Sequence, residues 1–394
     1  MPGLLLRLTY SFKKELIMRL KMDRETLLKG VGRTLGVVDR RGTMPILSHL
    51  FLQAEETSGL TIAATDLEVS FRGFYPAEVQ EPGALTLPAH YFHNLVKELH
   101  GEVLDLTGNE KANLQIQVGE SRYQLHGLPA DQFPPVPEIT DQKMVTVECK
   151  VLKEMIEKTI FSVSSDDLQY HLSGIFWERV EAEGGHQLRL VSTDGHRLTL
   201  IQRPLPQSEQ FALEEGILIP RKGVAEISRL LAEEEEVSLG LSKKSLALKA
   251  NNKYLFILLL EKKFPDYHRI IPESFAYSFT LSRPDLFDTL RRISLLSTER
   301  FKGVVLQLMP DALELTFTNP EVGEGRELLP LKMETGDPEN LPMQIGFNAR
   351  YLLEPLSVMT GEEVCLEVNE KDRPCRVLEK GDPDYFSIIM PWSL

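Results

Sequence analysis

The chain has 394 residues, 42% of them hydrophobic, and a formal net charge of −14. This length exceeds what one ordinary core accommodates and predicts two to four domains, while the apolar content argues against a disordered chain. The longest apolar run, residues 254–260, is far shorter than the roughly 20 residues that a membrane helix needs. Three cysteines, Cys149, Cys365 and Cys375, show no CxxC or paired His spacing, which indicates reduced thiols in a cytosolic protein.

The first 17 residues precede any regular pattern. Charged residues, among them Arg7, Lys13 and Glu15, interrupt their apolar stretch, and no small-residue cleavage site follows. A secretory signal peptide is therefore not expected. We interpret residues 1–17 as a disordered extension or a start-codon artefact, with Met18 as the true start.

Three segments of the chain follow one plan. An apolar strand is predicted at 45–53, 170–178 and 301–309, and a second strand then ends in Thr-Asp or Thr-Asn at Asp66, Asp194 and Asn319. The interval of about 125 residues is too long for a solenoid, whose repeats span 20–50 residues.

Two helical segments are predicted in each repeat. The first lies at 24–36, 149–163 and 283–297, and the second at 89–101, 221–230 and 349–360. Pro88, Pro220 and Asn348 precede the second helices, where proline and asparagine are favoured. The pattern predicts three homologous α+β domains, and copies joined head to tail with a fixed rotation tend to close into a ring.

Charge is divided unevenly between these elements. A negative chain argues against a nucleic-acid partner, because phosphate binding relies on lysine and arginine. The six helical segments nevertheless carry an excess of Lys and Arg, which leaves the rest of the chain more acidic than the total. If the helices share one face, that face is basic and suits contact with phosphates without base reading. An ordinary mixture of charges on helix surfaces is the alternative.

The stretch "VSTDGHRLTL" at 191–200 gathers residues that are typical of active sites. Asp194 and His196 could form a metal pair, or a base with its orienting group, in a hydrolase. No third ligand or nucleophile accompanies them, and no P-loop or Rossmann glycine pattern is present. Catalysis is therefore the weaker interpretation, and Asp194 is expected to brace a turn.

Eight motifs occur in one order between Met18 and Leu394: "MRLKMDRETLLKGV", "MPILSHLFLQ", "TDLEVS", "STDGHRL", "IPRKGV", "FPDYHRIIP", "IGFNARYLLEPL" and "IIMPWSL". With them the chain resembles the bacterial DNA polymerase III beta subunit, the replicative sliding clamp. The resemblance implies an α+β DNA clamp fold with similar domains at 18–141, 142–275 and 276–394. It further implies a head-to-tail homodimeric ring, with helices lining a central hole and antiparallel sheets outside. Such a ring encircles duplex DNA of any sequence and confers processivity on the polymerase, without catalytic activity, cofactor or metal.

The same resemblance implies an apolar cleft between the second and third domains. There the DNA polymerase III catalytic subunit, the clamp loader and other partners would dock a short peptide motif. In the docked complex Gly195 would make room for the peptide backbone, while Arg197 and Asn348 would hold its polar groups. Core packing is the alternative at each position, and Trp392 and Ser393 depart from the family's usual residues. The matching positions are Leu172, Thr193, Gly195, His196, Arg197, Leu198, Pro265, Arg269, Ile270, Asn348, Tyr351, Pro374, Cys375, Ile388, Met390, Pro391 and Trp392.

Candidate DNA contacts come from two sources. The resemblance implies Arg41, Tyr170 and His171, close to Asp166, which would repel phosphate. Five further cations are inferred only from their helices: Lys29, Arg33, Lys150, Arg221 and Lys222.

Leu295 and Leu296 match an apolar pair at the family's dimer interface, with a buried helix end as the alternative. A scaffold protein of the same α+β fold without DNA contact also stays open. The expected location is the cytoplasm, at the nucleoid, without membrane association.

Overall fold

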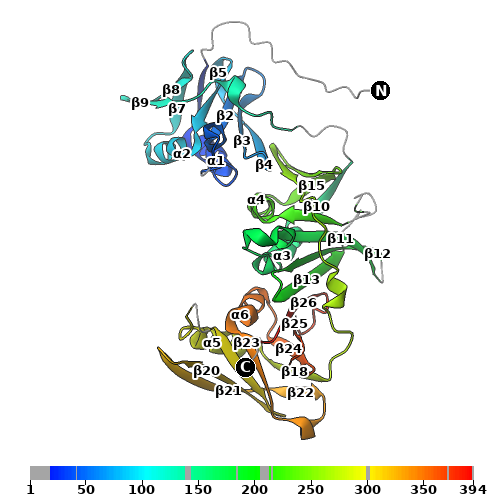
Figure 1. Cartoon of the computed structure of the whole chain (residues 1–394). Helices are drawn as coiled ribbons and strands as arrows, with labels where there is room; N and C mark the ends of the chain where they lie inside the picture. The colour runs from blue at the N-terminus through cyan, green and yellow to red at the C-terminus, as the bar shows by residue number, and fades with distance from the viewer. Residues whose placement is uncertain are drawn as a thin grey trace. The chain divides into compact units, whose positions relative to one another are not determined.

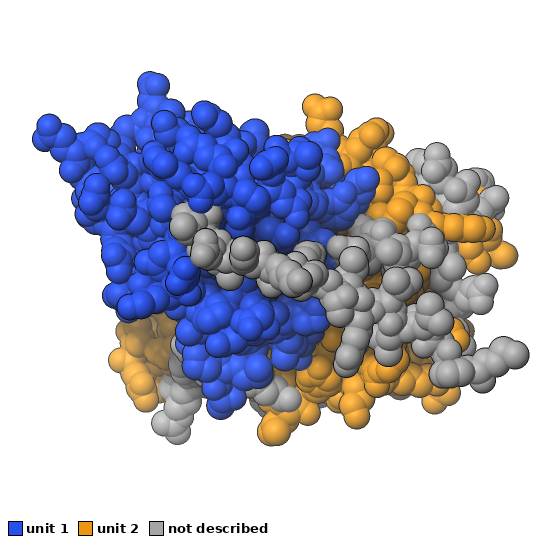
Figure 2. All heavy atoms as spheres, turned by 90° about the horizontal axis from the view of Figure 1, so that it is seen from above, with its two compact units in different colours: residues 1–140, 249–257 blue, residues 141–248, 258–394 orange. Residues whose placement is uncertain are grey.

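The computed structural model describes residues 18–40, 42–137, 143–182, 185–204, 213, 216–298, 302–370 and 372–392. The interpretation of residues 1–17 and the candidate Arg41 lie outside this set, as does Ser393. The chain forms two compact units, unit 1 with residues 1–140 and 249–257 and unit 2 with residues 141–248 and 258–394. Figure 1 shows the elements in chain order, and Figure 2 colours the atoms of each unit.

Unit 1 is built from antiparallel strands and one helix pair. Its five-stranded sheet has the order β5-β1-β7-β8-β9. A second run of neighbouring strands has the order β17-β4-β3-β2-β6. Helices α1 and α2 pack against each other. The bounds are β1 (Arg19–Asp23), α1 (Arg24–Thr34), β2 (His49–Glu55), β3 (Gly59–Thr65), β4 (Val69–Tyr75), β5 (Glu78–Glu81), β6 (Gly83–Pro88), α2 (Ala89–Glu98), β7 (Val103–Gly108), β8 (Asn113–Val118), β9 (Ser121–His126) and β17 (Lys253–Leu258).

Unit 2 contains the same arrangement twice. Its first copy has strands β10, β15 and β16 side by side and the helix pair α3 and α4. These elements are β10 (Met144–Glu148), α3 (Cys149–Glu157), β11 (Gly174–Ala182), β12 (Gly185–Thr193), β13 (Arg197–Pro204), β14 (Ile217–Pro220), α4 (Arg221–Leu231), β15 (Glu236–Leu241) and β16 (Ser245–Ala250).

The second copy has the helix pair α5 and α6 and a four-stranded sheet, β21-β20-β19-β23. Its elements are β18 (Tyr277–Ser282), α5 (Arg283–Ser294), β19 (Gly303–Leu308), β20 (Ala312–Asn319), β21 (Gly323–Pro330), β22 (Lys332–Thr335), β23 (Met343–Asn348), α6 (Ala349–Val358), β24 (Glu363–Val368), β25 (Cys375–Glu379) and β26 (Tyr385–Ile389).

One sheet joins the two copies in unit 2. Its nine strands run β14-β11-β12-β13-β26-β25-β24-β18-β22 among the described residues. The junction is the antiparallel pair β13 and β26, in which Arg197 lies opposite Ile389 and Ile201 opposite Tyr385. The site described below lies at one end of this junction.

The same backbone hydrogen bond joins the two helices of every repeat. The backbone N–H at the first residue of α1, α3 and α5 donates to a glutamate carbonyl after the partner helix: Arg24 to Glu102 at 2.8 Å, Cys149 to Glu235 at 2.8 Å and Arg283 to Glu362 at 2.9 Å. In two of the three repeats the arginine side chain also satisfies carbonyls near the end of the partner helix. Arg24 Nη1 donates to Val96 and Lys97, and Arg283 donates to Leu356 and Gly361. These bonds satisfy acceptors that a helix end leaves without an internal partner.

The predicted helices and strands exist, and most helices are shorter than expected, whereas α4 extends one residue further, to Leu231. The first helix of each repeat ends at Thr34, Glu157 and Ser294, respectively. In the second repeat, the range predicted as one helix, 149–163, also contains a separate 3-10 turn, Ile160–Ser162. Pro88, Pro220 and Asn348 stand at the N-caps of their helices, as predicted.

Two of the predicted strands begin late. Residues Pro45–Ser48 and Asp167–Leu172 form 3-10 turns, and the strands start at His49 and Gly174. In both repeats a serine hydroxyl closes the turn on the carbonyl three residues earlier, Ser48 on Pro45 at 2.7 Å and Ser173 on Tyr170 at 2.8 Å. A serine side chain that bonds its own backbone competes with strand pairing, which explains the error. No helix in the described part of the chain is long and apolar enough to cross a membrane. The domain boundaries at 141/142 and 275/276 stay predictions.

Candidate functional site

The turn between β12 and β13 is built around Asp194. Its Oδ1 accepts from the backbone N–H of His196 at 3.0 Å and of Arg197 at 3.1 Å. Asp66 makes the same bonds to Glu68 and Val69, and Asn319 Oδ1 accepts from Glu321. Asp194 therefore braces a turn that recurs in all three repeats, as the sequence predicts.

Gly195 is required by the conformation of this turn. Its φ is +86°, a region that other residues adopt only with strain, and a Cβ there would meet no atom within 4 Å. The space above the residue is open, which is compatible with the close approach of a peptide backbone.

Arg197 is buried, with 5% of its surface exposed. Its Nε donates to Asp194 Oδ2 at 3.1 Å, its Nη2 donates to the Phe161 carbonyl at 2.5 Å, and its Nη1 lies 2.5 Å from Glu354 Oε2 in α6. The guanidinium also lies over the Tyr351 ring, 4.6 Å from its centroid. The donors expected to hold a peptide's polar groups are thus engaged within the protein, and Arg197 ties β13 to α6. The side chain of Asn348 caps α6, with its Oδ1 accepting from the Arg350 N–H at 3.1 Å.

The rim of the site consists of exposed His196, Met390 and Trp392 together with half-buried Tyr351. The rings of His196 and Tyr351 are near-parallel at 18°, with centroids 6.2 Å apart. Met390 N–H donates to the His196 carbonyl at 2.9 Å, and Trp392 N–H to the Gly346 carbonyl at 2.7 Å. Burial and the Asp194 carboxylate raise the pKa of the Tyr351 phenol, so it is neutral at physiological pH. Met390 and Trp392 remain exposed and Pro391 half-buried.

Five predicted pocket residues are buried. Leu172, Leu198 and Ile388 belong to one buried apolar cluster, and Thr193 and Cys375 are also buried. Burial raises the pKa of the Cys375 thiol to about 12, so it is an inert apolar side chain. Their assignment to the peptide pocket stays a prediction.

The loop after β17 carries Pro265, Arg269 and Ile270. It is fixed by Phe264, which stacks on Phe176 at 5.0 Å, and by Tyr267, whose hydroxyl bonds Glu178 and Arg189. Burial and the Glu178 carboxylate raise the pKa of Tyr267. Pro265 is half-buried, whereas Arg269 and Ile270 are exposed, with Arg269 Nε 2.9 Å from Asp266.

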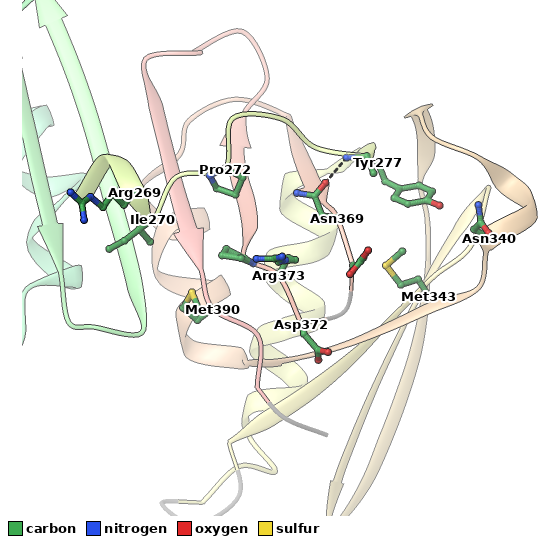
Figure 3. Close-up of a pocket in the computed structure, with 13 residues that line it drawn as sticks. Arg269, Ile270, Pro272, Tyr277, Asn340, Met343, Asn369, Asp372, Arg373 and Met390 are labelled. Carbon is green, nitrogen blue, oxygen red and sulfur yellow. Dashed lines mark hydrogen bonds between the residues drawn. The ribbon is translucent and has the colours of Figure 1, made fainter. Parts of the chain in front are cut away.

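A cavity of about 990 Å³ opens beside this loop (Figure 3). Four predicted residues line it: Arg269, Ile270, Pro374 and Met390. The other lining residues are not among the positions predicted from the sequence: Pro272, Ala276, Tyr277, Asn340, Met343, Asn369, Glu370, Asp372 and Arg373. Pro272 stands inside the quoted motif "FPDYHRIIP" and could have been included. The remaining ones come from three separate segments that no sequence pattern connects.

Buried and half-buried charges connect the elements around the β13 and β26 junction near the site. Lys158 Nζ lies 3.1 Å from Glu154, 3.3 Å from Glu379 and 3.4 Å from Asp382. Arg203 lies 2.7 Å from Glu154 and 2.6 Å from Asp382. Burial opposes ionisation of Glu154 and Asp382, but the bonds to Arg203 and Lys158 prevail and lower both pKa values. Glu154 and Asp382 therefore stay ionised at neutral pH.

The candidate DNA contacts are unequal in exposure. Lys29, Lys150, Arg221, Tyr170 and His171 are exposed, whereas Arg33 and Lys222 are half-buried. Arg33 lies over the Phe71 ring at 5.8 Å. The side chain of Asp166 caps the turn before Tyr170, accepting from Leu168 N–H at 2.9 Å.

Arg24 and Arg283 contribute to the positive charge counted for the helical segments. Both side chains, however, donate to backbone carbonyls near the end of the partner helix. The charge available on the helix surfaces is consequently smaller than the sequence count.

Exposed apolar residues lie on or near outer strands in both units. Leu295, at the end of α5, is 79% exposed, which excludes the buried helix end for this residue, and Leu296 is half-buried. Nearby β21 is the outer strand of its sheet, with Leu328 exposed. In unit 1 the outer strand β9 exposes Tyr123 to 42%, a feature that the sequence analysis missed. Its alternating pattern "SRYQLH" could have been identified as a one-sided edge strand.

No group of three or more His, Cys, Asp or Glu side chains in the described ranges is placed to hold a metal ion. The pair Asp194 and His196 is arranged for a turn, with the carboxylate bonded to backbone N–H groups and to Arg197.

Three repeats that follow one another along the chain, each with a helix pair and antiparallel strands, define a DNA clamp fold. The sequence matches three consecutive profiles of the DNA polymerase III beta subunit: the N-terminal domain at 18–137, the central domain at 146–266 and the C-terminal domain at 268–393. The chain belongs to the DNA polymerase III beta subunit family, the sliding clamps, and is a processivity factor of DNA replication without catalytic activity.

The sequences of relatives from several bacteria align with this chain over nearly its whole length. The beta sliding clamps of Caulobacter vibrioides and Pseudomonas putida are each 33% identical over 379 residues, which cover 95% and 96% of this chain and 99% and 100% of theirs. Among solved structures, the DNA polymerase sliding clamp of Caulobacter crescentus superposes with a TM-score of 0.87 at 32% identity, covering 96% of this chain and all of that one. The sliding clamp of Bartonella birtlesii, bound to griselimycin, gives 0.88 at 28% identity with the same coverage.

Proposed function

We propose that two copies of this chain close head to tail into a ring around duplex DNA. The observation that carries this proposal is a pair of outer strands in the terminal repeats that have a neighbour on one side only among the described residues: β9 with Tyr123, and β21 with the nearby Leu295. A free strand edge with exposed apolar residues is a ready interface for another chain. In a ring of two copies, β9 of each copy pairs with β21 of the other, so that no outer strand of this kind is left free in either copy.

DNA contact in the proposed ring is electrostatic and independent of sequence. Lys29, Lys150 and Arg221 are exposed cations on three different helices. Such cations attract phosphates at a distance and allow sliding, because no base contact has to break. Tyr170 and His171 add an aromatic and a polar side chain in an exposed turn, and we assign Arg33, Lys222 and Arg41 supporting roles.

The partners dock a peptide on the rim formed by His196, Tyr351, Met390 and Trp392, beside Ile270. Apolar, adaptable side chains of this kind suit a short linear motif. The DNA polymerase III catalytic subunit and the clamp loader are the proposed partners, in the cytoplasm at the nucleoid. The Bartonella birtlesii relative was solved bound to griselimycin, and we propose this ligand as a probe of the rim.

Retention on DNA of different topology tests the ring. Loaded on a nicked circular plasmid, the protein should remain bound through gel filtration at moderate salt, and linearisation should release it. Equal retention on circular and linear DNA would exclude topological attachment. Failure to bind either form would favour the alternative, a scaffold protein without DNA contact.

The docking rim is tested by deleting residues 390–394. The deletion leaves β26 intact, because this strand ends at Ile389, but removes the Met390 and Trp392 contacts. We expect the affinity for griselimycin and for a polymerase-derived peptide to fall by more than tenfold while the dimer mass is unchanged. Undiminished affinity for both probes would place the docking site elsewhere.

A further inference from the structure

The cavity beside the rim extends well beyond the positions that the clamp resemblance implies. It shares Ile270 and Met390 with the docking rim and continues to Tyr277 and Met343 (Figure 3). Its volume of about 990 Å³ is at the upper end of ordinary ligand pockets, which hold several residues of a peptide. A docked motif that ended at the rim would leave most of this space unused.

The walls of the cavity are fixed before any ligand arrives. Asn369 Oδ1 accepts from Ala276 N–H at 2.7 Å, and Asn369 Nδ2 donates to the Ser274 carbonyl at 3.0 Å. These two bonds pin the segment before β18 to the loop that carries Arg373. A preformed cavity binds with a smaller ordering cost than one that must assemble.

Arg373 lies across the middle of the cavity, between Ile270 and Met390 on one side and Tyr277 and Met343 on the other (Figure 3). Its guanidinium forms no ion pair with another described residue, whereas the second lining cation, Arg269, is paired with Asp266. Asp372 extends to the edge of the cavity, away from the guanidinium (Figure 3). The cavity thus offers a cation that is unpaired among the described residues, with apolar side chains on both sides of it and with Glu370 and Asp372 also in the lining.

We propose that this cavity binds the segment flanking the docked peptide motif, and that it selects a flank with a carboxylate next to an apolar side chain. The carboxylate pairs with the planar fork of Arg373, and the apolar side chain packs between Met343 and Tyr277. This inference rests on the proposed docking function and adds a second determinant to it. Partners with the same core motif would then differ in affinity through their flanks.

Peptides of two lengths separate the two proposals. The clamp-binding segment of the polymerase catalytic subunit from the same organism is synthesised alone, and with Glu-Leu-Glu or Gln-Leu-Gln appended at either end. Fluorescence polarisation with the full-length protein then gives the dissociation constants. At one of the two ends the acidic extension should tighten binding about tenfold over the unextended peptide, and about threefold over the Gln-Leu-Gln version, since exposed ion pairs are weak.

Three variants assign the effect to the guanidinium. Arg373→Gln should abolish the difference between the acidic and amide extensions and leave the unextended peptide unchanged. Arg373→Lys should keep part of the difference, because it retains charge without the bidentate fork. Lys380→Gln is the matched control: it removes another exposed cation, just beyond β25 and outside the cavity lining, and should preserve the full difference.

Two outcomes would overturn the inference. One is equal affinity of the wild-type protein for the acidic and amide peptides at both ends, and the other is an undiminished difference in Arg373→Gln. If the unextended peptide itself failed to bind, the docking rim would be excluded and the extension with it.

Discussion

At the scale of single residues, the site is decided by which polar groups are already engaged. Arg197, His196 and Asp194 stand within four positions, yet only His196 is exposed at the rim. Arg197 is enclosed by Asp194, Glu354 and two aromatic rings. We infer that Arg197 acts on the peptide indirectly, by holding Tyr351 and α6 against β13.

This role predicts different effects of two arginines that share one carboxylate. Glu354 pairs with buried Arg197 and also with exposed Arg350, at 2.8 Å. Arg197→Gln should lower the free energy of unfolding of unit 2 by about 3 kcal/mol, because it leaves buried acceptors unpaired. Arg350→Gln should cost less than about 1 kcal/mol. Urea unfolding followed by tryptophan fluorescence measures both, and similar losses would contradict a structural role specific to Arg197.

Gly195 allows a test of backbone strain apart from packing. A Cβ at this position meets open space, so Gly195→Ala should cost about 1 kcal/mol through its φ of +86° alone. Gly381→Ala, with φ +92° and equally open surroundings, is the control and should cost the same. A much larger loss at Gly195, measured by the same unfolding assay, would mean that the turn tolerates no side chain for a reason other than strain.

At the scale of elements, the helix pairs depend on how their ends are satisfied. Arg24 and Arg283 begin α1 and α5 and donate to carbonyls near the end of the partner helix, whereas Cys149 begins α3. Burial, together with Glu234 and Glu236, raises the pKa of the Cys149 thiol to about 11, so this position is neutral. The second repeat therefore lacks a cation where the other two have one.

The arginine contacts predict a position-specific loss of stability. Arg283→Met should lower the free energy of unfolding by about 2 kcal/mol, since the helix-end carbonyls lose charged donors in a half-buried setting. Arg291→Met, an exposed change on the same helix, should cost less than about 0.5 kcal/mol. Thermal or urea unfolding compares the two variants, and an equal effect would refute the capping role.

The β13 and β26 junction gives a pH dependence. The folded-state pKa values of Glu154 and Asp382 lie below their ordinary values of 4.5 and 3.8. A lowered pKa means that the stabilisation is complete above the ordinary value and is lost as the pH falls through the folded-state value. We therefore expect the unfolding free energy to drop below about pH 4.5.

The variant Asp382→Asn should be less stable at pH 6 but should lose about 1 kcal/mol less than the wild type between pH 6 and pH 3.5. Urea titrations at the two pH values measure this difference. Parallel losses in both proteins would show that other carboxylates govern the acid response.

At the scale of the whole molecule, net charge and function point in opposite directions. A chain with charge −14 binds DNA in the proposed ring only if its cations are concentrated where the duplex passes. Exposed Lys29, Lys150 and Arg221 lie on helices, in keeping with that distribution. The acidic remainder would discourage adhesion to nucleic acid elsewhere.

Ring closure predicts that one exposed leucine controls the oligomeric state. Leu295→Asp should convert the dimer to a monomer at micromolar concentration, because a carboxylate would be buried against an apolar partner surface. Leu168→Asp, at another exposed leucine, is the control and should remain dimeric. Light scattering after size exclusion gives both masses, and a dimeric Leu295→Asp would exclude this interface.

The sequence by itself determined the repeat, the element order and the family, because helix and strand periodicities and turn residues are local signals. It also predicted the bracing role of Asp194, whose bonds reach only two and three residues ahead. The tertiary structure decided which charges are free: Arg197, Arg24 and Arg283 are engaged by partners that lie 70 or more residues away. It alone assembled the cavity around Arg373, because burial and ion pairing depend on long-range packing that no local pattern encodes.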